Sequence, residues 1–319
     1  MKGQIVKPSV IDYEVNEGSW QPLINQEPFR LTDYSQGQVL ERAHIPRPFM
    51  EGLMNIREFD LAKQNLKTLT NHYMEDGVMV RRIGDLIKGW LSPSYKRMDA
   101  GPVFDTFIER ALQKGMVPYR AYNTDYRYQI AFIVPEVISP YPEEFIVVGL
   151  SMTTGDYGAA ALLLEMMILR IRCQNLALGY DVYRRVHLGS RFHAESDYVQ
   201  LSKKTIELDN RTVASAMGDV VDHGIKQIDF MKQVVTDANN KEIANPQTFY
   251  DRLKKKGFSK ELVETVKTTY ESDLPLDILP PQKSLWRMSN ALSFVAQSQA
   301  KVDRRIDLEK ASMDLLLAA

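Results

Sequence analysis

The longest apolar stretch of the chain runs from Ala159 to Leu169 and is interrupted only by Glu165. It is too short to cross a membrane, since a spanning helix takes about 20 apolar residues. We therefore expect this stretch to lie in a protein core. Helix and strand both stay open, because alanine and leucine favour a helix in its first half while Ile168 and Ile171 suit a strand in its second.

The segment that follows is rich in arginine. Between Met166 and His193 there is one acidic residue, Asp181, against five basic ones. The basic residues are Arg170, Arg172, Arg184, Arg185 and Arg191. Charged side chains beside a buried segment need a partner of opposite charge. That partner is either an acidic group of the protein itself or an anionic ligand.

Composition excludes several classes of protein. The 319 residues, 44% hydrophobic and 25% charged, are typical of a soluble globular protein and exclude a wholly disordered chain. The net charge of −1 gives no overall support for nucleic-acid binding. A single cysteine excludes an internal disulfide and fits a reducing compartment. No signal-like apolar stretch is found at the N-terminus, so we expect a cytoplasmic protein without a membrane partner.

The spacing of apolar residues and prolines predicts an α+β fold in three parts. Residues 1–50, with prolines at 8, 22, 28, 46 and 48, are expected to form an irregular arm. Residues 51–235 should form an α+β core around a central, largely antiparallel, curved sheet. Residues 236–319 should be helical.

Within this outline several elements can be placed. Helical spacing covers 49–73, and a hairpin is expected at 78–90 around Gly84 and Asp85. Strands are expected at 126–134 and 145–152. Tyr128, Ile130 and Phe132 should share one face of the first of these strands.

Further helices are expected at 211–231 and, as one long final helix, at 284–317. The final helix carries apolar residues and mixed charges. It can pack on its own domain or form a contact between subunits, and the sequence leaves both alternatives open.

The chain lacks the common catalytic signatures. It has no glycine-rich phosphate loop, no dinucleotide fingerprint, no H-E-x-x-H and no C-x-x-C. Cys173, His187 and His193 could supply three zinc ligands, but no paired spacing supports such a site. Cys173 with His187 could form a nucleophile and base, yet no glycine turn presents the sulfur. A buried cysteine and a hydrogen-bonded histidine are favoured, with no cofactor and no metal.

A metal-dependent nuclease needs clustered carboxylates. Glu195 with Asp197, and Glu207 with Asp209, are the nearest candidates. The first pair has the character of a polar loop and the second that of a helix start. We therefore keep a nuclease as a third alternative.

Tyrosines and basic residues alternate in the predicted sheet. Aromatic rings can stack on bases while arginine and lysine follow the phosphates, which is how single strands are held without sequence preference. The alternative is an ordinary solvated sheet face with arginines paired to acidic groups elsewhere. The residues assigned to single-stranded DNA are Arg81, Arg82, Lys96, Arg97, Arg120, Tyr122, Tyr126, Arg127, Tyr128, Arg170, Arg172, Arg184, Arg185 and His187. His187 is expected to orient a neighbour.

Five segments, taken in order, resemble the phage and plasmid proteins grouped as domain-of-unknown-function family 932. They are 91–99 (LSPSYKRMD), 172–175 (RCQN), 185–190 (RVHLGS), 205–210 (TIELDN) and 284–292 (SLWRMSNAL). The chain has Leu176 where the family usually has a glycine. The resemblance implies a phage or mobile-element origin, hence a bacterial host cytoplasm, and no established activity.

The predicted order of elements is also similar in outline to single-strand annealing proteins of the Erf and RecT kind. Such proteins form oligomeric rings or filaments with DNA in an outer groove. The leading hypothesis is therefore binding and annealing of single-stranded DNA in recombination or replication, by a homo-oligomer and without covalent chemistry. The alternative is a protein-interaction or structural role, as an oligomeric scaffold or an inhibitor of a host defence protein.

Overall fold

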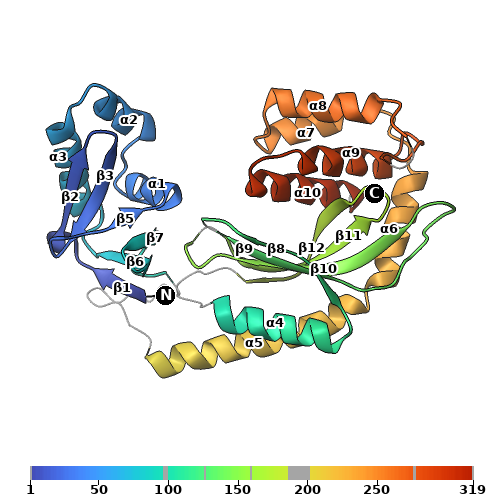
Figure 1. Cartoon of the computed structure of the whole chain (residues 1–319), viewed down its shortest axis with the longest axis horizontal. Helices are drawn as coiled ribbons and strands as arrows, with labels where there is room; N and C mark the ends of the chain where they lie inside the picture. The colour runs from blue at the N-terminus through green and yellow to red at the C-terminus, as the bar shows by residue number, and fades with distance from the viewer. Residues whose placement is uncertain are drawn as a thin grey trace.

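The chain is described from a computed structural model over residues 2–95, 100–125, 127–158, 160–185, 202–275 and 278–317. Helices and three sheets of largely antiparallel strands make up these ranges, which confirms the α+β class. The chain forms a small N-terminal lobe and a larger lobe built around a curved sheet (Figure 1).

The expected irregular arm is wrong, because residues 2–55 are mostly regular structure. The strands are β1 (Lys2–Val6), β2 (Ile11–Asn16), β3 (Ser19–Ile24), β4 (Glu27–Pro28) and β5 (Arg30–Leu31). The helices are η1 (Pro8–Val10), α1 (Asp33–Arg42) and α2 (Arg47–Asn55). Pro8 and Pro48 lie in the first turns of η1 and α2, where no intrahelical N–H bond is lost, and Pro28 ends β4. Pro22 lies inside β3, where its carbonyl accepts from the backbone of Phe29 at 3.0 Å.

The N-terminal lobe extends well beyond residue 50. It also contains α3 (Phe59–Tyr73), β6 (Val78–Ile83) and β7 (Leu86–Leu91). The strands β6 and β7 form the expected hairpin, and one sheet has the order β1-β6-β7-β5. A single core runs from Val6 to Trp90, so the boundary between lobes follows β7.

The larger lobe is built on a five-stranded antiparallel sheet of order β12-β11-β10-β9-β8. Its strands are β8 (Val117–Asn123), β9 (Tyr128–Ile133), β10 (Ile146–Thr154), β11 (Leu162–Arg170) and β12 (Asn175–Arg185). The apolar run from Leu162 onward thus belongs to strand β11. It lies between two other strands and is covered on both faces, which explains why it lacks the alternation of a half-exposed strand.

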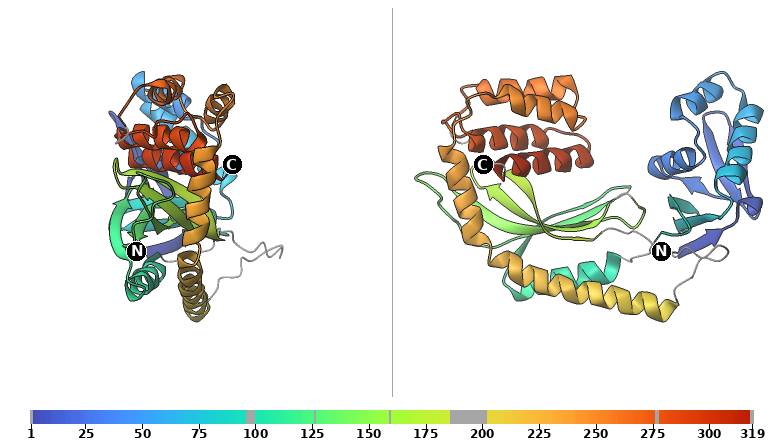
Figure 2. Two further views of the ribbon diagram at one scale, coloured as in Figure 1. Left: turned by 90° about the vertical axis from the view of Figure 1, so that its right-hand side faces the viewer. Right: turned by 180° about the vertical axis from the view of Figure 1, so that it is seen from behind.

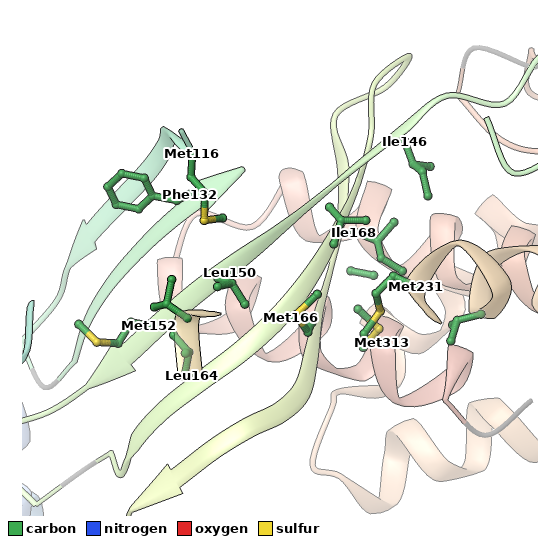
Figure 3. Packing of buried hydrophobic residues seen from close by; sticks show 14 of the residues in the cluster. Met116, Phe132, Ile146, Leu150, Met152, Leu164, Met166, Ile168, Met231 and Met313 are labelled. Atoms are coloured by element: carbon green, nitrogen blue, oxygen red, sulfur yellow. The ribbon is translucent and has the colours of Figure 1, made fainter. Parts of the chain in front are cut away.

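Helices cover both faces of this sheet (Figures 1 and 2). One face packs on α4 (Ala100–Gln113) and α5 (Lys203–Ile225), through Phe107, Met217 and their neighbours. Phe132 and Ile130 of β9 lie on this face, as their alternation predicts. Figure 3 shows how Met152, Met166 and other apolar side chains fill this core.

The remaining helices form the C-terminal part. They are α6 (Ile228–Asn240), α7 (Gln247–Lys255), α8 (Lys260–Glu271), α9 (Leu285–Gln297) and α10 (Val302–Leu316). The expected single final helix is wrong, because the chain turns at Ser298 and α10 packs back on α9 (Figure 1). Ser289 and Ser293 both share hydrogen bonds with Ser312, at 2.6 and 2.9 Å, which fixes the pair of helices.

The tip of the β10–β11 hairpin joins the two lobes. Gln38 of α1 donates to the carbonyl of Tyr157 at 2.8 Å and accepts from the backbone of Trp90 at 2.9 Å. Asp156 lies 3.9 Å from the buried guanidinium of Arg81. Gly158, at φ +83°, makes the left-handed turn that lets the tip pass beside β7.

Across the described ranges, no helix combines the length and the apolar character that a membrane crossing requires.

Candidate functional site

An open cleft of about 780 Å³ lies where the two lobes face each other. The N-terminal lobe, the β8–β9 turn and the start of α10 each contribute to its walls. Its lining consists of Asp33, Lys88, Asn123, Thr124, Asp125, Lys301, Val302, Asp303, Arg304 and Asp307. Residues more than 200 positions apart in the chain therefore meet at this place.

The N-terminal end of α10 forms one wall of the cleft. Its cap residue, Lys301, makes no side-chain hydrogen bond to the first turn. The first backbone N–H groups of a helix have no partner within the helix, and they carry a partial positive charge. This end of α10 is thus suited to an anionic group.

The charges that line the cleft differ in whether they are already neutralised. Asp33 pairs with Arg47 at 3.0 Å, while Asp303 and Asp307 lie 2.5 and 3.5 Å from the Arg127 guanidinium. Within the described ranges Lys88, Lys301 and Arg304 take part in no ion pair, and Asp125 is the one lining carboxylate of which the same holds. The lining carries four carboxylates and three cations; with the partners Arg47 and Arg127 included, five cations stand against four carboxylates, a net charge of +1.

Two of these cations contact aromatic rings. The Lys88 ammonium lies 5.1 Å from the centre of the Tyr157 ring, and the Arg304 guanidinium lies 6.0 Å from that of Phe258. Such contacts hold a cation in place without neutralising its charge. Lys88 is half-buried, and Lys301 and Arg304 are exposed.

Tyr128 and Tyr157 share a hydrogen bond between their hydroxyl groups, and the Tyr157 ring is the one that contacts Lys88 of the cleft lining. Burial raises the pKa of both phenols above the ordinary value, and the same hydrogen bond lowers that of Tyr128 while raising that of Tyr157. Both rings are thus held as neutral structural groups at physiological pH. Tyr128 is not presented for base stacking in the way that the sequence suggested.

Tyr122 lies between two guanidinium groups. The Arg120 group is 5.0 Å and the Arg305 group 5.9 Å from the centre of its ring. Tyr122 is half-buried, and the next residue, Asn123, lines the cleft. Of the predicted tyrosines in the described ranges, it is therefore the nearest in sequence to the cleft.

Four of the predicted phosphate-binding arginines pair instead with carboxylates of the same chain; Arg81 and Arg170 are buried, and Arg120 and Arg127 are half-buried. Arg170 binds Glu144 through two hydrogen bonds of 2.6 and 3.0 Å, and both side chains are at most 1% exposed. Arg120 binds Glu309 at 2.7 Å and through a second, shorter contact. The other two pairs are Arg81–Asp156 and Arg127–Asp303.

This arrangement corrects the assignment of these four residues as phosphate contacts. A charge removed from water needs a partner of opposite charge, and each of these guanidinium groups has a carboxylate of the same chain within 4 Å. Burial acts to lower the pKa of Arg120, yet the hydrogen bond and charge of Glu309 raise it overall. The arginine therefore stays charged without an external anion.

Among the other predicted residues, Arg82 and Arg172 have described side chains, and these two do not extend the cleft into a continuous groove. Arg82 lies over the Phe29 ring in the N-terminal lobe. Arg172 follows β11 and lies over Phe145, at the end of the five-stranded sheet that is away from the cleft. Arg184 and Arg185 lie on β12, where their backbones pair with Leu163 and Leu162 of β11. Lys96, Arg97, Tyr126 and His187 lie outside the described residues.

The cysteine segment has a structural role. The Arg170 guanidinium donates to the sulfur of Cys173 at 3.4 Å and to the carbonyl of Ile278 at 3.1 Å. Asn175 donates to the side-chain oxygen of Asn290 at 3.1 Å. Two of the five segments that carry the family resemblance, 172–175 and 284–292, are thus hydrogen-bonded to each other. The residues of these two segments serve the packing of β12 against α9.

In the part of the chain that is described, no three of the histidine, cysteine, aspartate and glutamate side chains converge as a metal-binding group. Glu207 and Asp209 lie on α5 away from the cleft lining. The other nuclease candidates, Glu195 and Asp197, fall outside the described residues, as does His193 of the zinc candidate.

Comparison with known proteins finds no matching family model, no matching curated protein and no matching solved structure. The resemblance to domain-of-unknown-function family 932 and to annealing proteins therefore stays a prediction from sequence.

The sequence did not single out Lys301 and Arg304, because they were assigned to the middle of one long helix. The available signal was the polar stretch Gln297-Ser298-Gln299, followed by Asp303 at a position that suits a first helical turn. Because α10 begins at this point, Lys301 and Arg304 lie in the wall of the cleft.

Proposed function

We propose that the protein binds single-stranded nucleic acid in the cleft between its lobes. The observation that carries the proposal is the group Lys88, Lys301 and Arg304, which come from both lobes and are free of ion pairs among the described residues. The uncapped start of α10 adds backbone donors beside them. This site replaces the groove of sheet arginines that the sequence suggested.

The modest charge of the cleft sets the expected behaviour. Three phosphate contacts on a single strand give a slope of log K against log salt of about −2, since each contact contributes about −0.7. This is much weaker than the salt dependence of proteins that bind DNA through extended basic surfaces. Binding should therefore be measured at low salt first.

The test is a fluorescence-anisotropy titration with a labelled oligothymidylate at two salt concentrations. The variant Lys88→Ala/Lys301→Ala/Arg304→Ala should lose most of the binding and of the salt dependence. A matched control, Lys204→Ala/Lys232→Ala/Lys255→Ala, removes three exposed lysines from three other helices and should retain both.

Two results would overturn the proposal. One is the absence of binding by the unaltered protein at low salt. The other is a cleft variant that binds as tightly as the control. A labelled duplex of the same length, bound equally well, would remove the preference for single strands. Annealing is then measured separately, as the rate at which two complementary labelled strands pair.

A second candidate is a role in protein assembly, which the internal pairing of the sheet arginines favours. Val137, Phe145 and Ile171 are 60%, 39% and 41% exposed, and the backbone of Ile171 donates to the carbonyl of Phe145 at 3.0 Å. These apolar side chains gather at the end of the sheet away from the cleft. We propose a second copy of the chain as the partner there.

Light scattering coupled to size-exclusion chromatography tests this second candidate. The variant Val137→Lys/Ile171→Lys should lower the molar mass to that of a monomer. An unaltered protein that already elutes as a monomer at micromolar concentration would contradict it.

A further inference from the structure

The rim of the cleft continues into the loop between α7 and α8. Arg304, which lines the cleft, has its guanidinium 6.0 Å from the centre of the Phe258 ring. Phe258 lies in that loop, two residues before Lys260 at the start of α8. Two residues span at most about 7 Å, so Lys260 is close to the end of the cleft.

Lys260 opens a second hollow, of about 310 Å³, between α7 and α8. Lys260 and Lys267 lie seven residues apart on one face of α8, and Lys254 lies opposite them on α7. The repeat of the helix brings residues i and i+7 to the same side. Three lysines therefore border a single groove.

Two of these lysines have weak intrahelical partners. Lys254 lies 3.6 Å from Asp251 and Lys267 lies 3.4 Å from Glu264, and all four side chains are roughly half exposed. Exposed pairs of this kind contribute little energy and exchange readily for another anion. Lys260 is in no ion pair within the described ranges.

Tyr250 also lines the groove and is 3% exposed. Its hydroxyl group is buried and has no hydrogen-bond partner among the described residues. An unsatisfied buried donor costs about 1–3 kcal/mol. A phosphate oxygen or a water molecule held by the surrounding lysines would supply the missing acceptor after a small movement of the side chains.

We infer that a strand bound in the cleft continues past Arg304 into the groove between α7 and α8. This inference rests on the proposed function and extends the same site. Lys254, Lys260 and Lys267 then hold phosphates of the distal part of the strand. Lys260 and Lys267 are about 10 Å apart along the helix axis, which matches about three stacked nucleotides of a single strand.

The experiment compares a short and a long labelled oligothymidylate, of about five and about 15 nucleotides, which span the range of known single-strand sites. The groove variant is Lys254→Ala/Lys260→Ala/Lys267→Ala. Binding of the short strand should match that of the unaltered protein. For the long strand, the salt slope should become shallower by about 2, because about 0.7 is lost with each phosphate contact.

A further variant, Tyr250→Phe, removes the buried hydroxyl and keeps the ring. Combined with Lys260→Ala, it should weaken long-strand binding more than Lys260→Ala alone. Circular dichroism checks that the helix content of the variant matches that of the unaltered protein. The control variant at Lys204, Lys232 and Lys255 should bind both strands normally.

The outcomes separate the two proposals. A groove variant that binds the long strand with an unchanged slope overturns the extension and leaves the cleft proposal standing. Equal loss for short and long strands also overturns it, because the groove would not then be a distal part of the site. Failure of the unaltered protein to bind either strand overturns both proposals.

Discussion

Helix α10 has two sides with opposite electrostatic roles. Its underside carries Glu309, which binds Arg120 of the sheet, and Lys310, which binds Glu165 at 2.6 Å. Its N-terminal end carries Lys301 and Arg304, which face the cleft without ion pairs among the described residues. Charges a few residues apart thus serve either to hold the fold together or to remain available to a ligand.

The difference teaches that local charge density does not identify a binding surface. The sheet arginines stand out in the sequence, yet their partners lie far along the chain: Glu309 is 189 residues from Arg120. The cleft cations are sparse and unremarkable in sequence. Among the described residues, the carboxylates that line the same cleft form no ion pair with them, and this depends on the folded structure.

The sharpest way to break this comparison is to remove a sheet arginine. Arg170→Ala should lower the free energy of unfolding by about 3–5 kcal/mol, because it leaves the Glu144 carboxylate buried without its partner. The control Arg172→Ala removes an exposed arginine two residues away and should cost at most about 1 kcal/mol. Urea titration followed by circular dichroism measures both. Similar values for the two variants would show that burial does not distinguish them.

A smaller effect on the free energy of unfolding is expected from the ion pair between Arg120 of the sheet and Glu309 of α10. Arg120→Ala, Glu309→Ala and the double variant form a thermodynamic cycle. Residues that share hydrogen bonds give coupling energies of about 0.5–3 kcal/mol, and this pair should lie in the upper half of that range. Chemical denaturation of the four proteins provides the value. A coupling near zero would mean that the pair contributes nothing beyond its separate parts.

The smallest effect is expected at the cleft. Lys301→Ala and Arg304→Ala should each change the free energy of unfolding by less than about 0.5 kcal/mol, as exposed substitutions usually do. Their thermal unfolding midpoints should therefore coincide with that of the unaltered protein. A large loss of stability at either position would place that side chain with the structural arginines and remove it from the site.

Much of the fold could be predicted from local patterns. The alternation at Tyr128, Ile130 and Phe132 gave the correct strand and placed Ile130 and Phe132 on one core face. The opposite face, with Gln129 and Ala131, is buried as well. The hairpin around Gly84 was confirmed, because its turn residues and the flanking strands agree. Proline content misled at residues 1–50, since prolines at helix starts and strand edges do not disrupt a fold.

The breaks between helices were harder to predict. Helical spacing continues across Ser298, and nothing in the apolar pattern shows that α10 reverses onto α9. The site depended on that break, because it creates the helix start beside Lys301. The arginines posed a different difficulty. Their sequence implied an anionic partner, but whether Glu144 and Glu309 or an outside ligand supplied it is a tertiary property.

The β10–β11 hairpin runs from the middle of the large lobe into the small one, where Asp156 meets Arg81. Through these contacts the hairpin fixes the position of the small lobe relative to the large one. Expressing the small lobe alone would strip Arg81 of the carboxylate that lies beside it in the interior. The two lobes are therefore held together by an ion pair and hydrogen bonds as well as by the chain itself, and we expect them to fold as one cooperative unit.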